Sequence, residues 1–170
     1  NALVGTGPQS YTLQVTSAGK TYAASSTMPT LVVLDQITSK QSVFDNDQRT
    51  ITVHYQDPPG VANWYRFAMF VNGRQVDNYF AASDKFTDGK SVINDLSQND
   101  IDIKPGDFVA VEMYCIDKSM YTYWDALAGQ SSNGPNGSVA PANPTNSISP
   151  AALGYFSAHT VQRKTMVVPQ

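Results

Sequence analysis

The chain has 170 residues, of which 41% are hydrophobic and only 15% charged, and its net charge is −3. This composition indicates a globular domain with one sizeable core and a weakly charged polar surface, as on extracellular β proteins. Without a basic field, nucleic acid is not an expected partner. The single cysteine, Cys115, excludes an intrachain disulfide and a cysteine-based zinc site. No segment approaches the ~18 apolar residues of a membrane span.

The residue pattern in the first third of the chain predicts several strands with short connections. Apolar and polar residues alternate over 11–16, and the turn SAGK then leads into a returning strand at 21–25. Residues 31–37 form a continuous apolar run, and 50–55 alternate again. Both of these segments are therefore expected to be strands.

A second hairpin is predicted at Asn72-Gly73, the preferred central pair of a type I′ turn. It joins a strongly apolar strand at 64–71 to a return strand at 74–80. The segment that follows is polar and is expected to hold only short strands or an irregular loop. Residues 108–116 are apolar on both faces, which predicts a central strand.

One short α-helix is expected near 119–128. Asp117 or Ser119 is placed to act as its N-cap, and Gly129 stands where a C-cap would be. A long loop, GQSSNGPNGSVAPANPTNSISP, then leads into an aromatic closing strand at 151–169. We read this strand as structural closure of the fold.

These elements predict a mainly β protein, an antiparallel β-sandwich of Ig-like or jelly-roll-like character with one short helix. Residues 30–170 form the sandwich domain. Residues 1–29 form a terminal hairpin, which either belongs to the sandwich or is the remnant of a preceding Ig-like domain. No βαβ pattern occurs, so a parallel sheet is not expected.

The sequence predicts no catalytic residue, metal ligand or cofactor. The two histidines, His54 and His159, fall within predicted strands, and no hydrolase, metalloprotease or nucleotide-binding motif occurs. A group of aspartates offers paired carboxylates for a glycosidase or, with 45–47, oxygen ligands for Ca²⁺, although aspartates in turns usually bind local backbone amides. The group consists of Asp84, Asp88, Asp95, Asp100, Asp102 and Asp107.

Aromatic residues supply the candidate ligand-binding positions. Alternation along 64–71 puts Tyr65, Phe67 and Met69 on the core face and leaves Trp64 partly exposed beside Arg66.

On the predicted helix, Tyr121 and Trp124 share a face, whereas Tyr123 points elsewhere. One helix face must pack on the sheet, and the other is free to form an aromatic platform for a sugar or a protein. The predicted binding residues are therefore Trp64, Tyr121, Tyr123 and Trp124, with simple packing as the alternative.

Five segments together resemble a known family: YTLQVTSAGKTYAASSTMP at 11–29, YQDPPGVANWYRF at 55–67, IKPGDFVAVEMYCID at 103–117, YTYWDAL at 121–127 and APANPTNSISPAALGYFSA at 140–158. The chain resembles the domain-of-unknown-function lipoproteins of Bacteroidetes that are encoded beside TonB-dependent outer-membrane receptors. The resemblance covers nearly the whole chain in order. It implies a lipid-anchored outer-membrane or cell-surface location for the full-length protein, of which this chain is expected to be a soluble fragment.

Three functional hypotheses follow from the residues and the resemblance. The first is a non-enzymatic, cell-surface binding or accessory module of an outer-membrane uptake system, with a TonB-dependent receptor and a glycan or protein ligand as partners. The second is an adhesin or structural surface protein. The third is a carbohydrate-active enzyme that uses paired aspartates.

Overall fold

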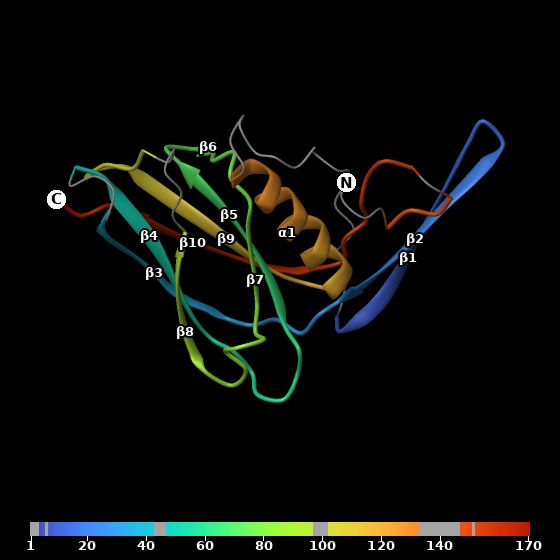
Figure 1. Ribbon diagram of the computed structural model, residues 1–170, viewed down its shortest axis with the longest axis horizontal. Helices are drawn as coiled ribbons and strands as arrows, with labels where there is room; N and C mark the ends of the chain where they lie inside the picture. Colours follow the sequence, from blue (N-terminus) through green and yellow to red (C-terminus); the bar gives the residue numbers. More distant parts are fainter. Residues whose placement is uncertain (1–3, 6, 43–46, 97–101, 133–146, 151) are drawn as a thin grey trace.

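The computed structural model describes every residue except 1–3, 6, 43–46, 97–101, 133–146 and 151. Within the described residues the protein is mainly β with antiparallel pairing and one helix, as predicted (Figure 1). The elements in chain order are β1 (Gln9–Ser17), β2 (Lys20–Met28), β3 (Leu34–Gln41), β4 (Arg49–Gln56), β5 (Trp64–Val71), β6 (Arg74–Gln75), β7 (Phe80–Ser83), β8 (Ser91–Leu96), β9 (Phe108–Ile116), α1 (Lys118–Ser132) and β10 (Thr160–Val167).

Two sheets supply the side chains of the main core. One has the strand order β10-β9-β5-β6, with β7 also paired to β5, and the other has the order β3-β4-β8. Alternate residues of both sheets meet in one apolar cluster, as expected for a β-sandwich. Its fully buried members include Leu34, Ile51, Val53, Tyr65, Phe67, Met69, Val109 and Met113.

Strand β5 shows how the sequence pattern positions the two faces of the larger sheet. Tyr65, Phe67 and Met69 are each 1% exposed and lie in the core between the sheets, which confirms their predicted role. Trp64 and Arg66 point to the opposite face and are partly exposed. Because side chains alternate along a strand, this opposite face is free to build a second cluster.

Both predicted hairpin turns have the expected left-handed backbone. Ala18 and Gly19 have φ values of 50° and 74°, and Asn72 and Gly73 have φ values of 50° and 82°. Two successive positive φ angles are the signature of a type I′ turn, whose twist suits a tight antiparallel hairpin. The turn chemistry was therefore read correctly from the sequence at both places.

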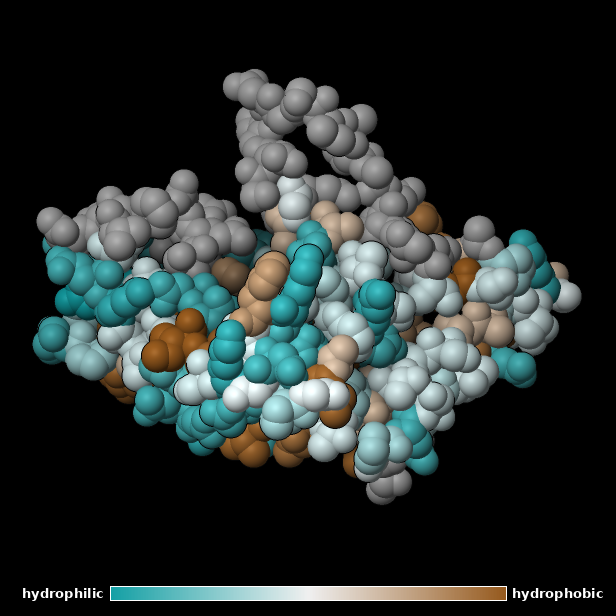
Figure 2. All heavy atoms as spheres, turned by 60° about the horizontal axis from the view of Figure 1, so that its bottom comes forward, coloured by the Kyte–Doolittle hydropathy of each residue, from teal (hydrophilic) through white to brown (hydrophobic). Residues whose placement is uncertain are grey.

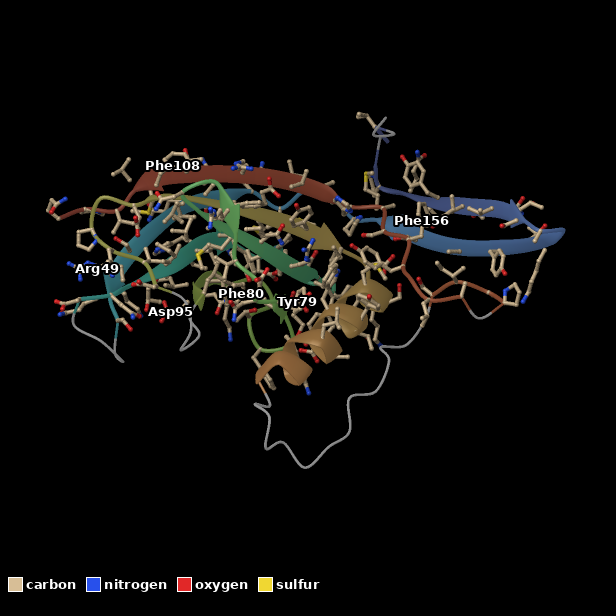
Figure 3. The ribbon with its side chains drawn as sticks, turned by 90° about the horizontal axis from the view of Figure 1, so that it is seen from above. Arg49, Tyr79, Phe80, Asp95, Phe108 and Phe156 are labelled. Carbon is tan, nitrogen blue, oxygen red and sulfur yellow. The ribbon has the colours of Figure 1, made fainter. Side chains whose placement is uncertain are left out.

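The predicted return strand at 74–80 is broken into two pieces. β6 pairs with β5 only at Arg74 and Gln75, and pairing resumes in β7, where Phe80 lies opposite Phe67. Val76 still donates its amide to the Met69 carbonyl on β5, and the residues after it leave the ladder, which lets Tyr79 reach the helix. Figure 3 shows Tyr79 beside α1. The prediction of one continuous strand here was wrong. Alternation of residue types does not by itself keep a segment paired, and here the packing of Tyr79 against α1 takes the place of strand pairing.

The end of the helix and the closing strand also differ from expectation. α1 continues through Gly129 and ends at Ser132. Gly129 does not have the positive φ of a C-cap glycine, so it is not the C-cap. Strand β10 covers only Thr160–Val167. The aromatic residues before it, including Tyr155 and Phe156, form no strand and pack instead toward α1 and β2. Most of the predicted long loop lies outside the described residues.

The hairpin of β1 and β2 forms its own sheet and projects at one end of the molecule (Figure 1). Its base is fixed by Asp117, whose Oδ2 accepts hydrogen bonds from the Ser26 hydroxyl at 2.5 Å and the Thr27 amide at 3.1 Å. The Ser26 hydroxyl in turn accepts a bond from the Ala158 amide at 2.9 Å. These bonds join the hairpin to the sandwich, and its assignment to a separate preceding domain stays a prediction.

Candidate functional site

Helix α1 lies on the outer face of the larger sheet, where its first turn is fixed by Asp117. The Oδ1 atom of Asp117 accepts bonds from the Met120 amide and the Ser119 hydroxyl, which makes Asp117 the N-cap that the sequence predicted as one of two choices. Met120 and Trp124, one helical turn apart, are 0% and 6% exposed. This face of the helix therefore packs on β5, β7 and β9.

Burial and hydrogen bonding act in opposite directions on the Asp117 carboxyl. Burial alone raises its pKa, but the bonds from Ser119, Ser26 and the amides of Met120 and Thr27 outweigh burial and hold the pKa below its usual value. The ionised carboxylate of Asp117 thus links the helix that covers the outer face to the projecting hairpin.

Arg66 lies under this helix with its guanidinium between two aromatic rings. Its guanidinium carbon is 3.9 Å from the ring centroid of Trp124 and 5.0 Å from that of Tyr114. Tyr114 lies directly opposite Arg66 on the neighbouring strand β9. Cation–π attraction of this kind contributes on the order of 0.5–2 kcal/mol, more where water is excluded.

Further aromatic rings surround Arg66, Trp124 and Tyr114, and they come from three separate parts of the chain. The Trp124 ring contacts the rings of Tyr79, Tyr123 and Tyr155 at centroid distances of 5.5, 5.3 and 5.2 Å. Tyr123 and Tyr155 are themselves 5.0 Å apart, and the His159 ring stands edge-on to Tyr114 at 5.0 Å. We call this group the Arg66 cluster; its members are Arg66, Tyr79, Tyr114, Tyr123, Trp124, Tyr155 and His159.

The carboxylate nearest to Arg66 along the strands is already engaged. Glu112 lies on β9 opposite Ala68, one alternation from the Arg66 position, and its Oε1 accepts a bond from Arg163 at 2.8 Å. Its Oε2 accepts the Tyr114 hydroxyl. Burial and this bond raise the pKa of Tyr114 to about 12, so the phenol stays protonated as the donor. Both oxygens of Glu112 are therefore taken by groups other than Arg66.

Arg66 has no ion-pair partner among the described residues. The described residues form ion pairs between Lys40 and Asp95, Lys104 and Asp102, and Arg163 and Glu112, and Arg66 is in none of them. Its Nε is buried without a hydrogen-bond partner. Burial and the nearby guanidinium lower the pKa of His159, so this imidazole is neutral near pH 7 and adds no second positive charge.

The structure brings the predicted binding residues into one region but gives them different exposure. Trp124 is buried at the centre of the Arg66 cluster, so its ring holds Arg66 and is not an open platform. Tyr123 is partly exposed at the rim. Trp64 and Tyr121 are partly buried against the same apolar group around Met120 and are not among the Arg66 cluster's ring contacts.

Sequence reasoning missed most of the remaining members. Tyr155 is 43% exposed and completes the aromatic rim, although it was interpreted only as part of the closing strand. His159 lies just before β10 rather than within a strand, and its Nδ1 is 3.1 Å from the Ser157 hydroxyl. The sequence offered one signal for this site, which is the charged side chain of Arg66 within the apolar and aromatic run 64–71.

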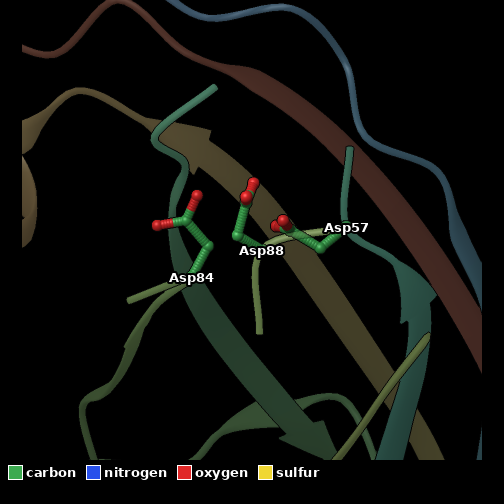
Figure 4. A group of neighbouring side chains, drawn as sticks. All are labelled: Asp57, Asp84 and Asp88. Atoms are coloured by element: carbon green, nitrogen blue, oxygen red, sulfur yellow. The ribbon is translucent and has the colours of Figure 1, made fainter. Parts of the chain in front are cut away.

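A second group of candidate side chains lies where the loop after β4 meets the loop after β7. Asp57, Asp84 and Asp88 each offer a carboxylate oxygen, and these atoms all lie within 4.8 Å of one another (Figure 4). Asp57 and Asp84 are buried and Asp88 is exposed. Carboxylate oxygens this close are suited to a hard cation such as Ca²⁺.

The same carboxylates hold the two loops together. Asp57 accepts the Tyr65 hydroxyl, Asp84 accepts the Asn63 amide at 2.7 Å, and Asp88 accepts the Gly60 amide at 2.7 Å. A Cβ at Gly89, whose φ is +69°, would stand 2.9 Å from the side chain of Pro59, so the loops pack closely here. Two of these carboxylates accept backbone amides and one accepts a side-chain hydroxyl, in each case from the other side of the contact or from β5 and not from a neighbouring turn residue, so the bonds join separate segments and do not close local turns.

The other predicted carboxylates are dispersed. Asp95 pairs with Lys40 and accepts the Thr52 hydroxyl, Asp102 pairs with Lys104, and Asp107 accepts the Asn72 amide group. Of the predicted group, the described residues thus bring together only Asp84 and Asp88. Asp100 and residues 45–46 lie outside the described residues.

The surface offers no continuous apolar area on the face seen in Figure 2, where hydrophobic residues form separate patches among hydrophilic ones. Individual large side chains are well exposed, with Phe86 at 78% and Ile93 at 69%. Scattered exposure of this kind is ordinary for a globular protein. In the described part of the chain, no helix has the length and apolarity needed to cross a bilayer.

Fold and site together define a mainly β, sandwich-like protein with an aromatic cluster under a single helix. The chain belongs to the family described as Domain of unknown function (DUF4249), whose model matches residues 6–165. This match confirms the expected membership of a domain-of-unknown-function family. No curated protein and no solved structure matches the chain.

Proposed function

We propose that this protein is a non-enzymatic, cell-surface binding or accessory module of an outer-membrane uptake system. In this proposal the full-length protein is a lipid-anchored lipoprotein of Bacteroidetes that works beside a TonB-dependent receptor. The resemblance of five segments to such lipoproteins supports the setting, and the weakly charged, polar composition is of the kind found on extracellular β proteins.

The Arg66 cluster is the observation that carries the binding role. A core needs apolar rings, but it does not need a partly buried guanidinium that has no counter-ion in the described part of the chain, because such a group is costly to keep. Arginine and tyrosine are also the residue types that concentrate binding energy at recognition sites. The partly exposed rings of Tyr123 and Tyr155 provide the edge at which a ligand meets the cluster.

The test is binding by the purified chain with matched variants. A glycan panel and a solubilised TonB-dependent receptor encoded next to the gene serve as probes for the wild type, Tyr155→Ala and Phe86→Ala. Phe86 is a suitable control because it is an exposed aromatic residue outside the Arg66 cluster. We expect at least one probe to bind, Tyr155→Ala to weaken its binding by about tenfold because the exposed ring would contact the ligand, and Phe86→Ala to have no effect.

Absence of binding to every glycan and to the receptor would contradict this proposal, as would equal losses in the two variants. Capture of a host ligand in place of the receptor would favour the adhesin hypothesis. Hydrolysis of a panel glycan that is lost in Asp84→Asn or Asp88→Asn would favour a carbohydrate-active enzyme, because these are the two predicted carboxylates that lie together.

A further inference from the structure

The unpaired charge of Arg66 limits what the Arg66 cluster is built to receive. Arg66 is partly exposed and only its Nε is buried, so a ligand that reaches it would meet the guanidinium from the solvent side. Two parallel N–H groups of a guanidinium fit the two oxygens of a carboxylate or of a sulfate. Arg66 is held between Trp124 and Tyr114, and its buried Nε has no acceptor. Among the described residues no acceptor meets this charge, since Glu112, the nearest carboxylate along the strands, is already bound by Arg163 and Tyr114, and an external anion would supply one.

The charge of that anion follows from the groups that face the Arg66 cluster. Arg66 is its only arginine or lysine, since the other members are tyrosines, a tryptophan and a histidine. Burial and Arg66 lower the pKa of His159, so it stays neutral at pH 7. One positive charge in a partly desolvated site balances one negative charge, whereas a dianionic phosphate would be left half compensated.

The residues around Arg66 indicate the chemical nature of the rest of the ligand. Tyr123 and Tyr155 are partly exposed rings 5.0 Å apart, and sugar rings pack their C–H faces on such surfaces. Nearby polar groups include the Ser157 hydroxyl and the His159 imidazole, which are 3.1 Å apart and have the donors and acceptors that sugar hydroxyls need. An apolar ligand would use none of the donors and acceptors that this pair still offers.

We propose that the Arg66 cluster binds a sugar that carries a single negative charge, with its carboxylate or sulfate-ester group on the Arg66 guanidinium and its ring against Tyr155 and Tyr123. This proposal rests on the proposed binding function and names the ligand class for it. Acidic sugars of both kinds share the chemistry that Arg66 recognises, and the experiment separates them.

The experiment is an NMR titration of the whole chain with five small probes. They are glucuronate, glucose 6-sulfate, glucose 6-phosphate, glucose and an acetylated dipeptide with a free carboxylate. We expect glucuronate or glucose 6-sulfate to bind about tenfold or more tightly than glucose, since hydrogen bonds to a charged group contribute a factor of this size. The stronger of the two identifies the acidic group, and both should bind more tightly than the phosphate and the peptide.

Variants locate the effect at Arg66. Arg66→Gln should remove the preference for the acidic sugar, whereas Arg74→Gln, which removes the same charge from an exposed position on β6, should preserve it. Arg66→Lys keeps the charge without the planar fork and should give an intermediate affinity. It also serves as the test if Arg66→Gln does not fold, and unchanged melting temperatures check the fold of each variant.

Several results would overturn the inference: equal binding of glucose and glucuronate, tighter binding of the phosphate or the peptide, no binding of any probe, or equal effects of Arg66→Gln and Arg74→Gln. Failure of the inference is separable from failure of the proposed function. If a neutral glycan or the receptor binds and Tyr155→Ala weakens it while Arg66→Gln does not, the binding role stands and the acidic sugar falls.

Discussion

The two faces of strand β5 differ in the polarity of what they bury. The inward residues Tyr65, Phe67 and Met69 enter a core in which nearly all neighbours are aliphatic or aromatic. The outward residue Arg66 lies one position away and enters an aromatic group with a buried nitrogen that has no acceptor. One strand thus has an apolar core on one face and an aromatic cluster around an arginine on the other, and substitutions on the two faces should have separable effects.

The largest expected effect is at the inner face. Phe67→Ala should lower the free energy of unfolding by about 3–5 kcal/mol, because it removes a fully buried ring and leaves a cavity between the sheets. Tyr155→Ala on the outer face should cost about 1 kcal/mol or less, since its ring is 43% exposed. Urea unfolding of both variants makes the measurement. Equal losses would show that the outer face is a second structural core.

The next effect concerns the helix that covers the outer face. Asp117→Asn should cost roughly 1–2 kcal/mol at pH 7, because it weakens an N-cap and the bonds to the hairpin. The folded-state pKa of Asp117 lies below its ordinary 3.8, so its contribution is complete above that pH and is lost as pH falls through the lowered value. Unfolding measured between pH 7 and pH 2 should therefore show the two proteins converging in acid. A constant difference throughout would contradict this role.

A smaller effect reports on the charge of Arg66 directly. Burial and Arg66 together hold the pKa of His159 below its ordinary 6.5, so its imidazole should become protonated only below that pH. Arg66→Gln removes one of these causes and should move the midpoint upward. The NMR shift of the His159 ring against pH measures both values. An unchanged midpoint in the variant would show that Arg66 does not act on this ring.

The smallest effect is expected in the hairpin, where stability should be graded along its length. Ser26 is 3% exposed and is held through Asp117, whereas Val15 near the tip is 46% exposed. Amide hydrogen exchange should therefore be slow at Ser26 and Thr27 and fast from Val15 to Tyr22. Uniformly weak protection, including at the base, would favour a hairpin that needs a missing domain.

The sequence predicted the elements whose signals are local. Asn72-Gly73 specified its turn and Asp117 its cap because the interactions lie within a few residues. The break before Phe80 and the position of Tyr155 depend on contacts with α1, which lies about thirty to forty residues away in the chain. Alternation places a side chain on a face but does not say which distant element covers that face.

The candidate site was accordingly found only in part. Trp124 and Tyr123 were chosen for their place on a helix but were expected on different faces, whereas the structure brings their rings together 5.3 Å apart in one cluster. Arg66 was noted only as the neighbour of Trp64, because nothing along the chain indicates that Glu112 is taken by Arg163. A missing counter-ion is a property of the assembled sheet, and no spacing in the sequence reports it.

The joint at Asp117 has a consequence for the order of folding. Ser26, Asp117 and Ala158 come from widely separated parts of the chain, so the bonds between them close very large loops. Contacts of such long sequence separation form slowly, whereas the β1–β2 turn closes over a few residues. We expect the hairpin to form early and to dock on the sandwich only later, when the segment around Ala158 has folded.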